Sequence, residues 1–299
     1  MRKIILSQRQ SPGDILVFTR ALGDLKMTHP DWLIDVRSPC QEIFENNPRI
    51  TPLKDDDPEV EKFDAEYPDI HNSGWSGMHF TEGYYKDLEK KLYTKINRTG
   101  LRPEIWISDE ERGWYNQVHC EFNYDGPFWV LNAGSKQDNE LKQYHRWQEV
   151  VDLLNKEFDG KAKIVQVGDK RHVHPKLEGV LDLVGKTDVR QLIRLIYHAH
   201  GTIGPISFQM HISGAFQQPA VVVAGGKEPI RWEMYPNHRY LAVNGAILCA
   251  AWDGCWKGGP AKKCSQLIDG VPRCFRMIEP YMVSDAVMMY YKGGALELK

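Results

Sequence analysis

Residues 3–25 have the sequence KIILSQRQSPGDILVFTRALGDL, a stretch that decides the fold class because a strand, a turn and a helix follow one another directly. The apolar run at Lys3–Ser7 predicts a short buried strand. Ser11-Pro12-Gly13-Asp14 predicts a turn into a helix, whose apolar residues recur at helical spacing as far as Leu25. The helix should end before His29-Pro30. Such a strand and helix form the first half of a βαβ unit.

Strand and helix patterns alternate along the rest of the chain, which predicts α/β architecture with parallel sheets. We expect further strands at residues 32–36, 128–132, 163–167, 180–184 and 219–224, and helices at 41–46, 83–97, 146–158, 188–199, 208–216 and 283–291. Residues 201–207 are expected to form a turn. The turn-rich segment 123–127 predicts a linker, which gives domains at 1–125 and 126–299. Two such domains would face a cleft at the carboxyl ends of their strands, where ligands bind in open α/β sheets.

The composition is that of a soluble globular protein, with 42% hydrophobic and 26% charged residues among 299. The formal net charge of -2 gives no electrostatic argument for a nucleic-acid or membrane partner. No apolar run is long enough to span a membrane, and the first is too short for a secretory signal. We therefore expect a cytoplasmic protein without a transmembrane segment, and an oligomer is compatible with the sequence.

Gly13 and Asp14 lie where the first strand gives way to its helix. Glycine lets the backbone come close to a ligand, and the helix dipole favours an ionised carboxylate there by about 0.3–1 kcal/mol. An ionised Asp14 could accept a proton from a substrate hydroxyl. The alternative is an ordinary N-cap, which Asp supplies to many helices.

Two later loops carry groups that suit phosphate oxygens. The first contains Ser135 and Lys142, whose small side chain and point charge fit a phosphate site, although the spacing is not that of a Walker motif. In the second, Ser207 would cap a helix with free N–H groups behind it, and His211 follows one turn later. The alternatives are an ordinary exposed loop and a structural histidine.

Four of the six cysteines, Cys249, Cys255, Cys264 and Cys274, fall in one Gly- and Lys-containing stretch. Disulfides are disfavoured in the cytoplasm, and four thiolates can enclose zinc or iron tetrahedrally. The intervals of five, eight and nine residues differ from those of a zinc ribbon. We predict a structural metal-binding finger over residues 249–274, closed to substrate; the alternative is four independent buried thiols.

Several short motifs follow one another in a particular order along the chain: Gly13-Asp14, Asn46-Asn47-Pro48, Val167-Gly168-Asp169, Asp182-Leu183-Val184-Gly185 and Gln209-Met210-His211-Ile212. This order resembles the heptosyltransferases of bacterial lipopolysaccharide synthesis, glycosyltransferase family 9, most firmly over residues 128–240. The resemblance implies a GT-B-type fold of two Rossmann-like domains, with the acceptor side in 1–125 and the nucleotide-sugar side in 126–299. Some relatives that modify proteins carry a metal-binding cysteine finger, so the resemblance also supports structural zinc or iron here.

The resemblance also implies an activity, the inverting transfer of a heptose-like sugar from an ADP-linked nucleotide-sugar to an acceptor hydroxyl, without a catalytic metal. Asp14 matches the catalytic base of the family, and Lys142 matches the lysine that meets the donor diphosphate. Asp169 falls where relatives contact the donor nucleoside. The donor-binding set is Gly13, Ser135, Lys142, Asp169, Ser207, Met210 and His211.

One motif departs from the family pattern. Relatives usually have Asp-Ser/Thr-Gly before Met-His, whereas this chain has Ile206, Ser207 and Phe208. The missing carboxylate and glycine favour a non-catalytic binding or assembly protein, while the retained Asp14 and Lys142 favour the enzyme. A transferase with another nucleoside-diphosphate sugar, or with a nucleic-acid base as acceptor, is a further alternative. The acceptor, whether saccharide, lipid-linked saccharide or protein, is not identified by the sequence.

Overall fold

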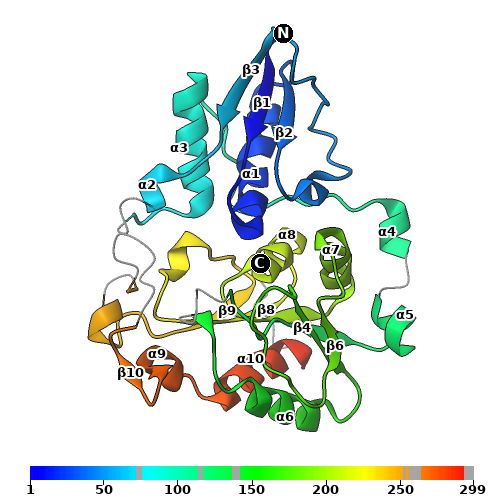
Figure 1. The fold of residues 1–299 in the computed structure, drawn as a ribbon, viewed down its shortest axis with the longest axis vertical. Coiled ribbons are helices and arrows are strands. Elements are labelled where there is room, and N and C mark those ends of the chain that lie inside the picture. Colours follow the sequence, from blue (N-terminus) through cyan, green and yellow to red (C-terminus); the bar gives the residue numbers. More distant parts are fainter. Residues whose placement is uncertain (72–75, 114–116, 137–141, 252–253, 256–263, 293–299) are drawn as a thin grey trace. The chain divides into compact units, whose positions relative to one another are not determined.

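The computed structural model describes residues 1–71, 76–113, 117–136, 142–251, 254–255 and 264–292. The chain divides into two compact units, Met1–Gly113 and Trp114–Lys299 (Figure 1). The boundary predicted at residue 125 falls inside the second unit, just after helix α5 (Gln117–Phe122). Within the described ranges, no helix has the length and apolar character that a membrane span requires.

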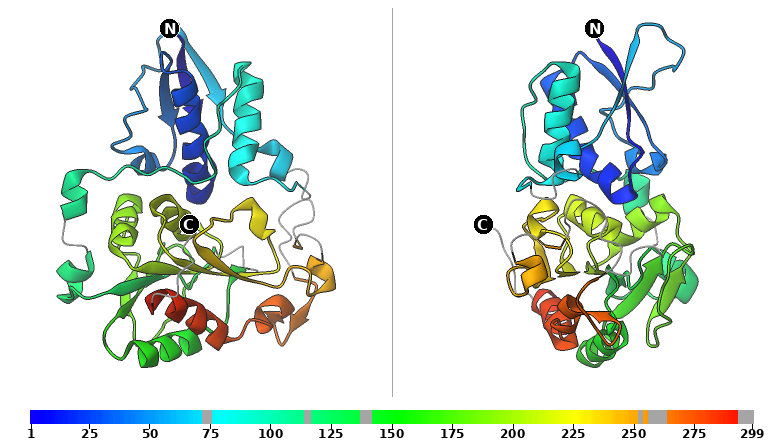
Figure 2. Two further views of the ribbon diagram at one scale, coloured as in Figure 1. Left: turned by 180° about the vertical axis from the view of Figure 1, so that it is seen from behind. Right: turned by 60° about the vertical axis from the view of Figure 1, so that its left-hand side comes forward.

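The first unit is built on three parallel strands in the order β2-β1-β3. The central strand is β1 (Lys3–Ser7), flanked by β2 (Leu33–Arg37) and β3 (Val60–Asp64). Helices α1 (Pro12–Thr28) and α3 (Phe80–Leu92) pack against one another (Figure 2). The shorter elements are η1 (Gln41–Phe44), α2 (Pro68–His71) and α4 (Asp109–Gly113).

The second unit has a sheet of six parallel strands in the order β6-β5-β4-β7-β8-β9. Its strands are β4 (Phe128–Leu131), β5 (Lys163–Gly168), β6 (Leu181–Val184), β7 (Gly201–Gly204), β8 (Ala220–Gly225) and β9 (His238–Ala242). Counted from β4, this is the doubly wound order 3-2-1-4-5-6. The strand order reverses between β4 and β7, and dinucleotides bind at that switch point in such sheets.

Helices cover both faces of this sheet (Figure 1). On one face lie α6 (Trp147–Phe158) and α10 (Pro280–Tyr291), which pack together; on the other lie α7 (Val189–His198) and α8 (Phe208–Phe216). The remaining elements are η3 (Ile230–Trp232), η4 (Leu248–Ala250), the hairpin β10 (Leu267–Ile268) with β11 (Val271–Pro272), and α9 (Arg273–Arg276).

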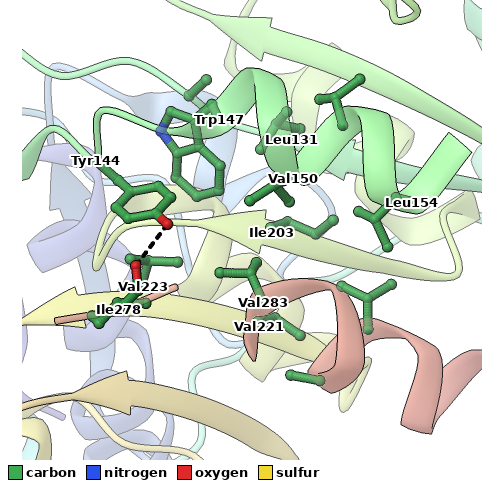
Figure 3. Close-up of a cluster of buried hydrophobic side chains, with 14 of the residues drawn as sticks. Leu131, Tyr144, Trp147, Val150, Leu154, Ile203, Val221, Val223, Ile278 and Val283 are labelled. Carbon is green, nitrogen blue, oxygen red and sulfur yellow. Dashed lines mark hydrogen bonds between the residues drawn. The ribbon is translucent and has the colours of Figure 1, made fainter. Parts of the chain in front are cut away.

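The larger core lies between α6, α10 and the sheet (Figure 3). Trp147, Val150 and Leu154 form the inward face of α6, as their helical spacing predicts, and Val283 approaches from α10. Each such side chain contributes about 1.5–3 kcal/mol when it is fully buried. At the edge of this core, the Tyr144 hydroxyl donates to the Ile278 carbonyl oxygen at 2.8 Å.

Strand β7 is where the sequence prediction was wrong, because residues 201–204 were expected to belong to a turn. It is a central strand of four residues, two of them glycines, so it lacks the β-branched run that identifies β8. Gly201 packs against the Trp129 ring: a Cβ there would lie 2.4 Å from a ring carbon. Close packing against Trp129 therefore explains why glycine occupies this position.

Candidate active site

Residues that follow β4 and β7 meet at the switch point of the larger sheet. The Asn132 side-chain amide donates to the Ser207 hydroxyl at 3.2 Å and to the Gln209 side-chain oxygen at 3.3 Å. Ser207 is the N-cap of α8, so the free N–H groups of that helix begin here. Gly204 permits this approach, because a Cβ there would lie 2.4 Å from the Gln209 amide nitrogen. The loops therefore form a polar rim at a helix N-terminus, a position whose free N–H groups suit an anion.

Lys142 lies at this rim and forms an ion pair. Its ammonium is 2.8 Å from a Glu228 carboxylate oxygen and 3.4 Å from the Ile206 carbonyl oxygen. Glu228, just beyond β8, is buried, whereas 23% of the Lys142 side chain is exposed. Burial raises the pKa of Glu228, and the neighbouring Lys142 opposes that rise. The ion pair holds the Lys142 ammonium beside Ile206, the residue that precedes Ser207.

His211 lies one turn into α8 and is buried together with Met210. Both of its ring nitrogens have partners, the Tyr235 hydroxyl at 2.8 Å and a Glu233 carboxylate oxygen at 2.9 Å. His211 thus ties α8 to the segment after β8, and Met210 packs in a small core cluster on that side of the sheet. Burial and the nearby His211 lower the pKa of a second histidine, His238, to about 3.

Ser135 and Asp169 lie on loops that follow β4 and β5. The Ser135 backbone pairs with that of Val173 through two hydrogen bonds of 3.1 and 3.0 Å. The guanidinium of Arg171 binds the Asp169 carboxylate and holds its pKa well below the usual range. The His174 ring packs between the glycines of these loops, where a Cβ on Gly168 would lie 1.9 Å from it. The two loops thus form one packed surface.

Asp14 belongs to the first unit and is the third residue of α1, whose N-cap is Ser11. One carboxylate oxygen accepts the Ser11 backbone N–H at 3.1 Å, and the other accepts the Tyr67 hydroxyl. Gly13 is the second residue of the helix. Asp14 therefore holds part of the N-terminal capping interaction without being the N-cap itself.

The four clustered cysteines are free, half-buried thiols. Cys249 lies in η4 and Cys274 in α9, while the Cys255 backbone N–H donates to the Gly226 carbonyl oxygen at 2.9 Å. Burial, with a smaller contribution from the other three thiols, raises the pKa of Cys255 to about 11. Among the residues that the structure describes, no three His, Cys, Asp or Glu side chains are arranged to hold a metal ion. Residues 252–253 and 256–263 of the predicted finger lie outside that description.

The family model for glycosyltransferase family 9 (heptosyltransferase) matches residues 92–251, more than half of the chain. The chain belongs to this family. The sequence-based recognition is thereby confirmed, and the protein is a glycosyltransferase. No curated protein sequence matches it.

Solved structures share the fold of this glycosyltransferase over nearly its whole length. The glycosyl transferase family 9 protein of Veillonella parvula aligns with a TM-score of 0.68 at 14% identity, covering 98% of this chain and 97% of that one. Iron-containing dodecameric TibC from enterotoxigenic E. coli has a TM-score of 0.68 at 16% identity, covering 98% and 77%. E. coli ADP-heptose LPS heptosyltransferase II has a TM-score of 0.57 at 14% identity, covering 99% and 100%. These likenesses confirm the predicted α/β fold with parallel sheets.

The structure of the glycosyltransferase brings together part of the predicted donor set. Lys142 and Ser207 lie at the same rim, because the Lys142 ammonium contacts the carbonyl oxygen of Ile206, the residue before Ser207. Ser135 and Asp169 lie on two loops that are joined by backbone hydrogen bonds. Met210 and His211 are buried beneath the rim. Sequence reasoning missed Glu228 and Tyr67. Glu228 could have been selected from the sequence, because it is a carboxylate shortly after the β-branched strand β8. Nothing in the local sequence pattern points to Tyr67.

Proposed function

We propose that the protein is an inverting glycosyltransferase that moves a heptose-like sugar from an ADP-linked donor to an acceptor hydroxyl. The observation that carries the donor side is the Lys142 ammonium held next to the N-terminus of α8 at a nucleotide-type switch point. TibC, which has the same fold, has been solved with ADP-D-β-D-heptose, and heptosyltransferase WaaC of E. coli with ADP. These complexes support an adenosine diphosphate as the leaving group here.

Displacement of a nucleoside diphosphate needs a base on the acceptor and positive groups on the departing phosphates. We assign the base to Asp14, whose carboxylate lies in the first turn of α1. It would take the proton of the acceptor hydroxyl while the hydroxyl oxygen attacks the anomeric carbon. The bond to the diphosphate breaks on the opposite face, so the anomeric centre inverts. Lys142 and the α8 N–H groups would take up the charge that develops on the departing diphosphate.

His211 has a supporting part in this proposal. Since both ring nitrogens are engaged by Tyr235 and Glu233, the histidine orients the start of α8 from below. Met210 packs in the same cluster and helps to hold that helix in place. The direct contacts to phosphate then come from Lys142 and from the backbone after Ser207.

Calorimetric titration with ADP, GDP and UDP tests the donor site. We expect selective binding of ADP, and a loss of at least tenfold in affinity for Lys142→Met combined with Glu228→Gln. Glu228→Gln alone is the matched control, because it removes the same ion pair but keeps the ammonium. If none of the three nucleotides binds, or if the double variant binds ADP like the control, the proposed donor site is wrong.

We also propose that Cys249, Cys255, Cys264 and Cys274 hold a structural zinc or iron. The donor set is suitable, since three thiols lie within electrostatic range of Cys255 and a metal ion would draw all four to the thiolate form. TibC is described as iron-containing. A metal ion held by these cysteines would fix the positions of Cys255 and Cys274, which both contact Gly226 or lie next to it. Protein purified anaerobically with less than stoichiometric zinc and iron would contradict this site.

A further inference from the structure

Asp14 has a second hydrogen-bond partner that comes from the neighbouring strand. In a parallel sheet of order β2-β1-β3, the strand order reverses between β1 and β3, so the segments after these strands meet. Asp14 follows β1 and Tyr67 follows β3. The ladder continues one residue past β3, where the Ala65 N–H donates to the Ser7 carbonyl oxygen at 2.8 Å. This places the Tyr67 hydroxyl on the Asp14 carboxylate.

The Tyr67 ring is fixed by its neighbours. It is 1% exposed, stacks on Phe80 with ring centroids 4.7 Å apart, and meets Tyr84 edge-on at 4.9 Å. Gly83 makes room for it, because a Cβ there would lie 2.7 Å from the Tyr67 Cβ. These contacts hold the ring in the orientation in which its hydroxyl donates to Asp14.

The Asp14 carboxylate is therefore held at both oxygens, by the Ser11 N–H at one and by Tyr67 at the other. Each carboxylate oxygen has two lone-pair directions, so one remains on each for an incoming hydroxyl. A hydrogen-bond donor at each oxygen fixes the rotation of the carboxylate. The contact with Tyr67 thus sets the direction of the group that we assign as the base.

We propose that Tyr67 is a positioning residue for the transfer reaction: its hydroxyl orients the Asp14 carboxylate before the acceptor binds. The inference rests on the proposed function, in which Asp14 is the base. Tyr67 remains protonated throughout and exchanges no proton with the substrate. Misdirection of a reacting group by about 1 Å can cost on the order of 100-fold in rate.

The test is Tyr67→Phe, which keeps the stacked ring and removes only the hydroxyl. The assay is release of ADP from ADP-heptose with water in place of the acceptor, together with ADP titration and thermal unfolding. We expect kcat to fall about 10- to 100-fold while ADP affinity stays within twofold.

Tyr85→Phe is the matched control. Tyr85 also donates a buried hydroxyl from α3 to a carboxylate of α1, but that carboxylate is Asp24, at 2.6 Å. A purely structural effect would be similar in both variants, so Tyr85→Phe should lose stability and keep kcat. Should Tyr67→Phe fail to fold, 3-fluorotyrosine at position 67 replaces it; this altered donor should change kcat while ADP affinity stays within twofold.

Wild-type kcat in Tyr67→Phe would overturn the inference, and so would equal losses of kcat in Tyr67→Phe and Tyr85→Phe. Asp14→Asn separates this failure from that of the proposed function. If Asp14→Asn is inactive while Tyr67→Phe is fully active, only the role of Tyr67 is wrong. If Asp14→Asn releases ADP at the wild-type rate, or if the wild-type enzyme releases none, the proposed function fails and the inference with it.

Discussion

The ion pair between Lys142 and Glu228 gives the most quantitative prediction, and Lys142→Met is the perturbation. The variant keeps an unbranched apolar stem but leaves the Glu228 carboxylate buried with no cation at 2.8 Å. Loss of one partner from a fully buried pair costs about 3–5 kcal/mol. Because 23% of the Lys142 side chain is exposed, water can replace part of its effect. We therefore expect a loss of about 2–3 kcal/mol in the free energy of unfolding.

The loss should depend on pH. Burial already raises the pKa of Glu228, and removal of Lys142 takes away the group that opposes the rise. A carboxyl whose folded pKa is raised binds protons more tightly in the folded state, so stability falls as the pH increases above the unfolded value of about 4.3. Lys142→Met should thus be most destabilised at high pH and approach the wild-type stability in mild acid.

Thermal unfolding of the wild-type, the two single variants and the double variant with Glu228→Gln is the assay. For a unit of this size, 1 kcal/mol corresponds to about 2–4 °C, so Lys142→Met should lower Tm by about 5–10 °C. The double variant should recover part of this loss, with a coupling energy of about 1–3 kcal/mol. Purely additive losses, or an unchanged Tm for Lys142→Met at pH 8, would refute the reasoning.

Two further predictions concern the same unit. In Gly204→Ala, the added methyl would lie 2.4 Å from the Gln209 amide and 2.9 Å from the Asn132 carbonyl oxygen, so we expect a loss of about 1–3 kcal/mol and weaker ADP binding. Gly113→Ala meets no atom within 4 Å and is the control for unfolding measurements; equal Tm values would contradict the packing argument. The lowered pKa of His238, about 3, means that its share of stability is complete above about pH 6.5 and is lost as the pH falls toward 3. His238→Gln should reduce this acid sensitivity by up to about 1.4 kcal/mol per pH unit in denaturant titrations, and an unchanged pH slope would exclude the assignment.

The sequence predicts elements best where the period is strong. The helix over residues 146–158 and the strand over 219–224 appear at nearly the expected bounds, because one has a clear apolar face and the other a β-branched run. Strand β7 was missed, since its glycines are there to pack against Trp129 and not to form a turn. Strand β9 was missed as well, because its half-exposed residues give no buried run.

The sequence likewise predicts some residues of the candidate site and not others. Asp14, Lys142 and Ser207 could be selected because they follow strands, and the carboxyl ends of parallel strands meet at one edge. Their partners come from distant positions: Glu228 is 86 residues after Lys142, and Tyr67 is 53 after Asp14. Local patterns carry no information on such pairs. The engagement of both His211 nitrogens was equally invisible, since it depends on where Glu233 and Tyr235 fold back.

The most direct test of the central claim is the rate of ADP release from ADP-heptose by the wild-type enzyme and by Asp14→Asn, with ADP binding measured on the same samples. Transfer by a general base predicts release by the wild-type, a loss of about 100-fold or more in Asp14→Asn, and equal ADP affinity in both. Equal rates of release would contradict Asp14 as the base, and no release by either protein would contradict the proposed donor.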